Sequence, residues 1–294
     1  MPSLNPFSLI LALGASFGLF RIALASKPAQ RLDWLLVGLF TLVGALIGSR
    51  LGYTLLHTSY FMAHPVEIAQ FWLGGFTWEG ALGGGLLFLF FAKLIWQWPF
   101  LNLLDRISLL LLPMGLAGWL GCWLTGAGYG QILTTGSWWG IQTLDETGTS
   151  ALRTPVQPLA AISLVVFMGF AELLLYPSQT TGKKGFVAGL IFSADMLLFS
   201  FLRADPTLTW QNLRIETWVA MLYTLAGAVA LICLLLHERK GDEKSEQRYQ
   251  PINDFFARIF AKKRKSHETE SGTRANQYRP RRRRQEPDQT PEAD

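Results

Sequence analysis

The sequence predicts an all-α integral membrane protein of about seven transmembrane helices, followed by a mostly disordered basic tail. Residues 1–236 hold 11 Lys/Arg and 10 Asp/Glu within long apolar runs, whereas residues 237–294 hold 15 and 11. A soluble body of this size would carry many more charged residues. We therefore expect two parts, a seven-span membrane domain over residues 1–236 and a cytoplasmic polar tail over residues 237–294.

Seven stretches are long and apolar enough to cross the hydrocarbon core, which takes about 20 residues of helix. The first has no basic residue before Arg21, so we interpret it as a retained span and not as a cleaved signal peptide. The expected spans are roughly residues 4–25, 34–56, 78–97, 107–125, 157–176, 186–202 and 217–236.

The basic residues of the short loops predict the orientation. Loops on one side contain Lys27, Arg31, Arg106, Lys183 and Lys184, and the basic tail follows on that same side. The three opposite loops together hold only three basic residues. Because Lys and Arg favour cytoplasmic loops, we expect the N-terminus outside and the C-terminus in the cytoplasm.

Several polar side chains occur at one expected depth, near the outer ends of the spans. An ionised group in a span costs several kcal/mol and normally faces a bundle interior or a wet cavity. The sequence therefore predicts a shared polar cavity. The alternative is a buried salt bridge in which Arg50 pairs with Asp195 or Glu79. The residues at this depth are Arg50, Tyr53, Glu79, Gln157, Asp195 and Arg203.

Glycines recur at intervals of four, at Gly44, Gly48 and Gly52 in the second span and at Gly80 and Gly84 in the third. Small residues at this spacing let membrane helices approach closely, which is the favoured interpretation. A second interpretation is that glycine-rich backbone supplies N–H groups to an anion. The chain has no HxxxH, HExxH or paired-cysteine spacing, so no metal site and no cofactor are predicted.

Five segments carry a family resemblance. In order and spacing they resemble the prolipoprotein diacylglyceryl transferase family. The resemblance implies a seven-span fold with a cytoplasmic C-terminus. The segments are "GSRLGYTLL" (48–56), "FWLGGFTWEGALGG" (71–84), "PMGLAGWLGCWLTGAGYG" (113–130), "TPVQPLA" (154–160) and "GFVAGLIFSADMLLFSFLRADP" (185–206).

The same resemblance implies an activity and its partners. The family moves the diacylglyceryl group of phosphatidylglycerol onto the lipobox cysteine of an exported precursor and releases glycerol phosphate. This reaction takes place at the outer face of the bacterial cytoplasmic membrane. The implied partners are therefore phosphatidylglycerol or another anionic phospholipid, and an exported precursor with a lipobox.

The chain departs from the family at several polar positions. The family's "SFHGG" is replaced by residues 77–81, so that Glu79 stands in place of a histidine. The family's "GRxGNFxNxExxG" falls on residues 118–130, where Trp119 replaces the arginine and Cys122, Thr125 and Ala127 replace two asparagines and a glutamate. The matching positions are Arg50, Gly52, Tyr53, Gly80, Gly121, Gly130, Pro155, Gln157, Gly189 and Arg203.

Two functions follow as hypotheses. In the first, the protein is a divergent diacylglyceryl transferase in which Arg50 and Arg203 hold a phosphate and Glu79 acts as the base. In the second, it is a non-catalytic protein that binds phospholipid or prolipoprotein on the same scaffold. For lipid or substrate binding we expect Tyr53, Gly80, Gly121, Tyr129, Gly130, Gln157 and Asp195.

The tail contains one amphipathic stretch, over residues 251–265. Its face of Phe255, Phe256, Ile259 and Phe260 is followed by a basic run, a pattern typical of helices on anionic inner-leaflet lipid. For the arginines at 281–284 the favoured interpretation is a disordered, solvated tail, and the alternative is a run that binds lipid headgroups or RNA. We expect no nucleic-acid partner.

Overall fold

The structure is a computed structural model that describes residues 6–134, 136–145, 147–175 and 180–239. The chain divides into two compact units, Met1–Leu234 and Leu235–Asp294. The expected amphipathic helix at 251–265 and the arginines at 281–284 lie outside the described residues. Both therefore stay predictions.

Long apolar helices make up the first unit. Among the described residues, six helical stretches are long and apolar enough to cross a membrane, and they confirm a helical multi-pass membrane protein. Five contain α1 (Pro6–Leu24), α2 (Arg31–Leu56), α4 (Trp78–Trp96), α6 (Leu111–Thr125) and α7 (Val156–Leu175), and the sixth is the last helix, Ile215–Arg239.

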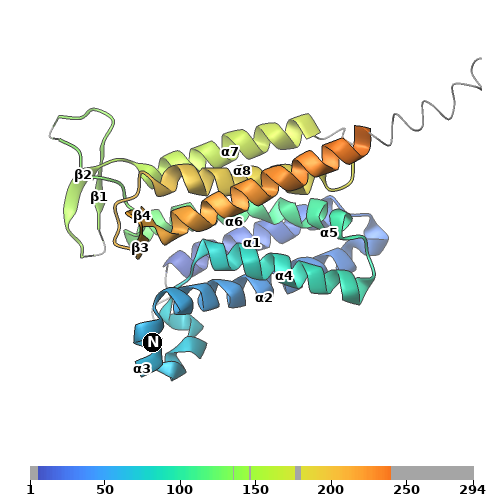
Figure 1. Ribbon diagram of the computed structural model, residues 1–294, viewed down its shortest axis with the longest axis horizontal. Helices are drawn as coiled ribbons and strands as arrows, with labels where there is room; N and C mark the ends of the chain where they lie inside the picture. Colours follow the sequence, from blue (N-terminus) through green and yellow to red (C-terminus); the bar gives the residue numbers. More distant parts are fainter. Residues whose placement is uncertain (1–5, 135, 146, 176–179, 240–294) are drawn as a thin grey trace, which may run out of the picture. The chain divides into compact units, whose positions relative to one another are not determined.

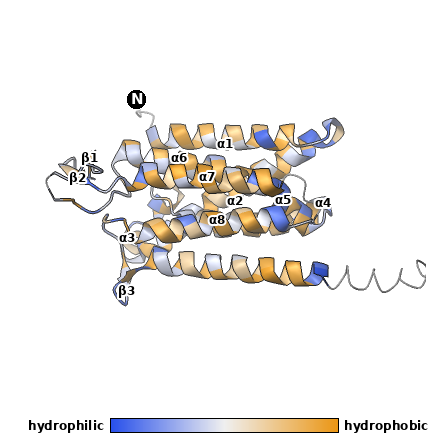
Figure 2. Cartoon of the chain, turned by 90° about the horizontal axis from the view of Figure 1, so that it is seen from above, coloured by the Kyte–Doolittle hydropathy of each residue, from blue (hydrophilic) through white to orange (hydrophobic). Residues whose placement is uncertain are grey.

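The expected sixth span forms α8 (Lys183–Ser200), which is more polar than the other long helices and is not among the six stretches. It contains Lys183, Lys184 and Asp195, and it lies beside α7 and the last helix (Figure 1). A seventh span and the orientation in the membrane therefore stay predictions. Figure 2 shows apolar residues along the lengths of the long helices, as expected for surfaces that face lipid.

Short elements connect the helices. The hairpin β1 (Ile141–Leu144) with β2 (Ser150–Arg153), the hairpin β3 (Thr209–Trp210) with β4 (Leu213–Arg214), and α3 (Thr58–Ala63) lie at one end of the long helices, and α5 (Phe100–Ile107) lies at the other (Figure 1). The remaining connections are the 3-10 turns Pro28–Gln30, Pro65–Ala69, Phe71–Leu73 and Ser108–Leu110.

Both hairpins are antiparallel. The turn of the second consists of Gln211 and Asn212, both with positive φ, as a two-residue hairpin turn requires. This short turn leads directly into the last helix. The end that carries the hairpins is the one that the charge pattern predicts to be outside.

Helices α2 and α4 touch through their glycines, as the spacing of four predicted. A Cβ atom built on Gly48 would lie 2.3 Å from the carbonyl oxygen of Gly80, and one on Gly80 would lie 2.2 Å from that of Gly48. Gly84 packs against Gly44 in the same way. This contact between backbones positions the start of α4, where Thr77 caps the helix by accepting from the N–H of Gly80.

Two apolar clusters complete the packing. One surrounds Leu89, Leu103 and Ile22, and joins α1, α2, α4 and α5. The other surrounds Trp119 and Leu164, and joins α6, α7 and α8. At the end that carries α5, Arg21 of α1 pairs with Glu172 of α7 at 2.5 Å, so Glu172 makes a contact near the helix ends.

We predict that Gly48→Ala destabilises the protein, because the added methyl group overlaps the carbonyl of Gly80. Overpacking of this kind typically costs about 1–3 kcal/mol in free energy of unfolding. The measurement is unfolding of the purified protein in detergent. Gly169→Ala is the matched control, since a Cβ there meets nothing within 4 Å. Equal stability of the two variants would contradict the close contact.

Candidate functional site

The residues expected at one depth separate into three groups in the structure. Arg50 lies with the segment between α3 and α4, Glu79 and Arg203 lie near one another, and Asp195 lies between α7 and α8. Of the six predicted residues, Arg50 lines the cavity described below, and the other five are not part of its lining.

The guanidinium of Arg50 is buried and is held by main-chain carbonyls. Its Nε donates to the carbonyl of Ile68 at 3.1 Å and its Nη1 to that of Gly75 at 3.3 Å. The carbonyls of Glu67 and Gly74 accept further hydrogen bonds from Nη2 and Nη1. Arg50 therefore holds the whole segment from Glu67 to Gly75 against α2.

Two glycines make this arrangement possible. Gly74 and Gly75 both have positive φ, a backbone conformation that residues with a Cβ rarely adopt. The ring of Tyr53 lies beside Gly75, and its centre is 5.9 Å from the Arg50 guanidinium. Phe61 of α3 packs at 5.2 Å from the same group. Tyr53 thus lies on the same face as Arg50, as the sequence predicted.

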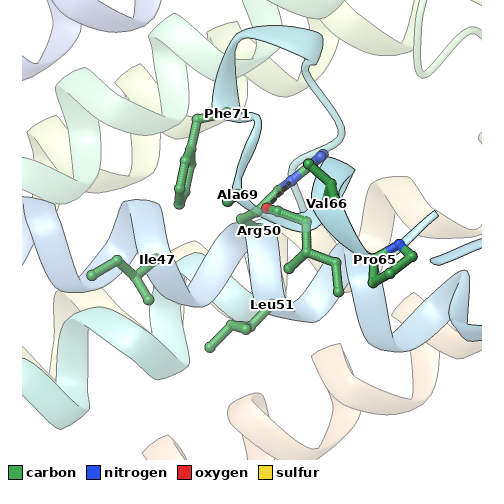
Figure 3. A pocket seen from close by; sticks show the side chains of 8 residues that line it. Ile47, Arg50, Leu51, Pro65, Val66, Ala69 and Phe71 are labelled. Carbon is green, nitrogen blue, oxygen red and sulfur yellow. Dashed lines mark hydrogen bonds between the residues drawn. The ribbon is translucent and has the colours of Figure 1, made fainter. Parts of the chain in front are cut away.

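Arg50 also lines a cavity of about 460 Å³ between α2 and the segment after α3 (Figure 3). The alternative of a buried salt bridge is wrong for the described residues, where neither Asp195 nor Glu79 pairs with Arg50. Backbone carbonyls satisfy the guanidinium instead. The cavity is lined by Ile47, Arg50, Leu51, Pro65, Val66, Ile68, Ala69 and Phe71.

Arg203 belongs to a ring of four charged residues, Arg203, Asp205, Arg214 and Glu216. Asp205 accepts two hydrogen bonds from Arg203, at 2.9 Å and 2.6 Å, and one from Nη2 of Arg214 at 3.1 Å. Glu216 Oε2 accepts from Arg203 Nη1 at 2.7 Å and lies 3.6 Å from Arg214 Nη2. Two cations and two anions balance, so the ring carries no net charge.

The ring controls the ionisation of its members. Burial acts to raise the pKa of Asp205, but the hydrogen bond from Arg203 and the charges of both arginines lower it overall. Burial acts to lower the pKa of Arg203, but Asp205 and Glu216 outweigh that effect and raise it. Both residues are therefore charged at neutral pH.

Glu79 lies in the first turn of α4, within electrostatic range of this ring. The charges of Glu216, Arg203 and Arg214 act on its carboxylate. Both carboxylate oxygens are buried and have no hydrogen-bond partner among the described residues. The Tyr223 hydroxyl donates to the main-chain carbonyl of Glu79 at 3.0 Å, which ties α4 to the last helix. Glu79 thus has two buried, unpaired carboxylate oxygens within electrostatic range of two arginines.

The glycine-rich segment after α6 packs against the same ring. A Cβ on Gly128 would lie 3.6 Å from Nε of Arg203 and 3.8 Å from the Cβ of Cys122. Gly130 forms a bridge with Arg203, and the carbonyl of Tyr129 accepts from the N–H that follows Arg203 at 2.8 Å. Tyr129 and Gly130 therefore position the backbone around Arg203.

Asp195 is separate from the ring. It accepts a hydrogen bond from Ser163 through Oδ1, whereas Oδ2 has no partner among the described residues. The indole of Trp119 lies beside it, outside hydrogen-bond geometry. Asp195 thus lies beside Trp119, which occupies the position where the family resemblance predicts an arginine.

The remaining predicted residues make packing or main-chain contacts. Gln157 donates to the carbonyl of Ala127 at 3.0 Å, and a Cβ on Gly121 would lie 2.6 Å from the ring of Phe7. Gly80 faces Gly48, as described above. The lipid-binding roles expected for these residues stay predictions.

Sequence reasoning missed Arg214, Asp205 and Glu216 as site residues. The available signal was the segment from the end of α8 to the start of the last helix, which places two arginines and two acids within residues 203–216. Only the hairpin turn at Gln211 and Asn212 brings these four charges together, because it reverses the chain between them.

A sequence model of the prolipoprotein diacylglyceryl transferase family matches residues 2–233. The chain belongs to this family. It is 31% identical to the phosphatidylglycerol–prolipoprotein diacylglyceryl transferase of Tolumonas auensis over 218 residues, which are 70% of this chain and 80% of that protein. The family resemblance of the sequence is thereby confirmed.

Two further relatives carry the same name. The protein of Bordetella parapertussis is 29% identical over 196 residues, or 64% of this chain and 73% of that protein. The protein of a Polaromonas species is 32% identical over 149 residues, or 50% and 52% of the two chains. The family match spans all the elements that surround the ring, from α4 to the last helix.

We predict that Arg50→Lys loosens the segment 65–75, because an ammonium group cannot donate to four separated carbonyls. Amide hydrogen exchange in this segment should become faster, with little change in the β1–β2 hairpin. Arg21→Lys is the matched control, since Arg21 pairs with Glu172 near the other ends of the helices. Unchanged exchange over 65–75 in Arg50→Lys would show that the carbonyl contacts do not hold the segment.

A second prediction concerns the pH dependence of the ring. The pKa of Asp205 is lowered in the folded protein, so its contribution to stability is present above its usual value of 3.8. It is lost as the pH falls through the lower folded value. The difference in unfolding temperature between wild type and Asp205→Asn should therefore be largest near neutral pH and shrink below pH 3.8. A difference that is constant from neutral pH to pH 3 contradicts this.

Proposed function

We propose that this protein transfers the diacylglyceryl group of phosphatidylglycerol to the lipobox cysteine of an exported prolipoprotein. Membership of the family and the names of its relatives support the substrates. The observation that carries the mechanism is that the buried, unpaired carboxylate of Glu79 lies within electrostatic range of the ring that contains Arg203. A base and a phosphate-binding cation are the two groups that this reaction needs.

In the proposed step, the cysteine sulfur attacks the glyceryl carbon that carries the phosphate. The new C–S bond forms a thioether as the C–O bond breaks, and the electron pair of that bond stays on the phosphate oxygen. Glycerol phosphate leaves. Glu79 accepts the thiol proton, and Arg203 stabilises the charge that grows on the phosphate. Nothing is oxidised or reduced.

Arg50 takes a positioning role in this scheme. Its guanidinium donates hydrogen bonds to the carbonyls of residues 67, 68, 74 and 75. This segment ends two residues before Thr77, which caps α4. Arg50 therefore acts on Glu79 through the backbone. The expected contact of Arg50 with phosphate would require these hydrogen bonds to be exchanged.

The proposed place of action is the outer face of the bacterial cytoplasmic membrane. Exported precursors are available there, and the ring lies at the end of the bundle that the basic loops predict to be outside. Inner-leaflet anionic lipid at the basic tail is a separate proposal that concerns residues outside the described part. No observation in the described residues favours the non-catalytic alternative.

We predict that Glu79→Gln abolishes transfer more completely than Glu79→His. Gln retains the size but loses the proton acceptor, whereas His supplies a group that titrates near neutral pH. General-base contributions are typically about 100- to 10,000-fold, so the two variants should differ clearly. The measurement is transfer of labelled phosphatidylglycerol to a lipobox peptide, per amount of folded purified protein.

Two outcomes would count against this mechanism. Unchanged specific activity in Glu79→Gln would remove Glu79 from the reaction. No transfer by wild type, together with binding of the lipid or the peptide, would favour the non-catalytic alternative.

A further inference from the structure

We propose that Arg214 is a second phosphate-binding residue, and that Glu216 occupies the phosphate position between Arg203 and Arg214 until the lipid displaces it. The proposal rests on the proposed function and names how the same site takes its anionic substrate. It is carried by the hydrogen bonds of the ring, by unpaired buried polar atoms, and by the different ways in which the two carboxylates are held.

The two carboxylates of the ring are held differently. Asp205 binds Arg203 through both oxygens and also accepts from Arg214, so three hydrogen bonds hold its side chain. Glu216 uses one oxygen, with one hydrogen bond to Arg203 and a longer contact of 3.6 Å to Arg214. Paired, bidentate contacts are the stronger kind. Glu216 is therefore the anion that a ligand displaces more easily.

The position of the Glu216 oxygen suits a phosphate oxygen. It lies between Nη1 of Arg203 and Nη2 of Arg214, within 4 Å of both. The phosphodiester of the lipid has two non-bridging oxygens that share one negative charge, so it can accept hydrogen bonds from both guanidinium groups at once. Asp205 keeps the two arginines in place during the exchange, because it contacts both.

The ring also contains a donor that has no partner. Nε of Arg214 is buried and forms no hydrogen bond within the described part of the chain. Buried donors are nearly always satisfied, so an unpaired one calls for a ligand or an ordered water. The two unpaired oxygens of Glu79 lie close enough for the arginines to act on them. A polar ligand with acceptors and hydroxyl donors, such as a phosphoglycerol headgroup, satisfies both kinds of atom.

The charge balance supports the same occupant. With Glu216 in place the arginine pair is neutralised, and the buried site is stable when empty. Once Glu216 has left, two arginines face one Asp205, and the local charge is positive. Such a site favours a phosphate that becomes more negative as the leaving group departs. A competing explanation is that the ring only braces the β3–β4 hairpin.

The experiment measures binding of glycerol phosphate to the purified full-length protein by calorimetry, with inorganic phosphate as a second probe. We expect Arg214→Gln to weaken the affinity for glycerol phosphate at least tenfold, and Glu216→Gln to strengthen it, because the competing charge is removed. Arg21→Gln, which removes an arginine from a carboxylate pair near the other ends of the helices, is the matched control and should bind as wild type does.

The outcomes separate the possibilities. Wild-type affinity in Arg214→Gln, or weaker binding in Glu216→Gln, overturns the proposal. Should Arg214→Gln fail to fold, Arg214→Lys and Glu216→Gln still test the proposal. A ring with a purely structural role predicts no gain in affinity for glycerol phosphate in Glu216→Gln. Equal affinity for inorganic phosphate would assign the site to phosphate alone and overturn the headgroup assignment.

The transfer assay distinguishes this proposal from the proposed function. Transfer by wild type with an unchanged KM for phosphatidylglycerol in Arg214→Gln would overturn the role of Arg214 and leave the function standing. Binding of glycerol phosphate with the expected changes, but no transfer by wild type, would support the arginine pair and overturn the function. Neither binding nor transfer by wild type would overturn both.

Discussion

The contact between the backbones of α2 and α4 is the constraint on which the outer end of the bundle depends. Gly48 and Gly80 have no side chains between them, so the helices approach until carbonyl oxygens face Cα atoms. Thr77 then donates to the carbonyl of Ser49 while it caps α4. The position of Glu79, two residues later, follows from this junction.

Arg50 and Arg203, two arginines of this end, are held by different means. Arg50 is satisfied by carbonyl dipoles, which leave its formal charge uncompensated but remove the need for an acidic partner. Arg203 is paired with two carboxylates and shares them with Arg214. The hydrogen bonds of Arg50 hold a backbone segment in place, whereas the ring around Arg203 can exchange one of its carboxylates for an anionic ligand. The two sites are therefore suited to different tasks.

Belonging to a transferase family does not by itself say how this chain performs the reaction. Trp119, Cys122, Thr125 and Ala127 lack the charge of the family's arginine and glutamate. In the structure, other charged groups surround Arg203, and they come from the loop and hairpin before the last helix and from the first turn of that helix. In the proposed mechanism, the charged groups of the site come from this part of the chain, on a scaffold that the glycines maintain.

The sequence by itself determined the helical membrane class, the glycine contact of α2 with α4, and the family. These features depend on local composition and on residue spacing along single helices, which a linear pattern records. It also identified Arg50, Glu79 and Arg203 as residues that need an explanation in an apolar surrounding. It did not determine which groups these residues contact.

Only the tertiary structure decided that Arg50 binds carbonyls and that Arg203 shares two carboxylates with Arg214. Two positive-φ glycines turn the carbonyls of residues 74 and 75 toward Arg50, and a two-residue hairpin turn returns Arg214 to Asp205. Expected depth in the membrane placed Arg50, Asp195 and Glu79 at one level, but depth says nothing about position around the bundle. The partners of a buried charge depend on that lateral position, which is set by how the helices pack.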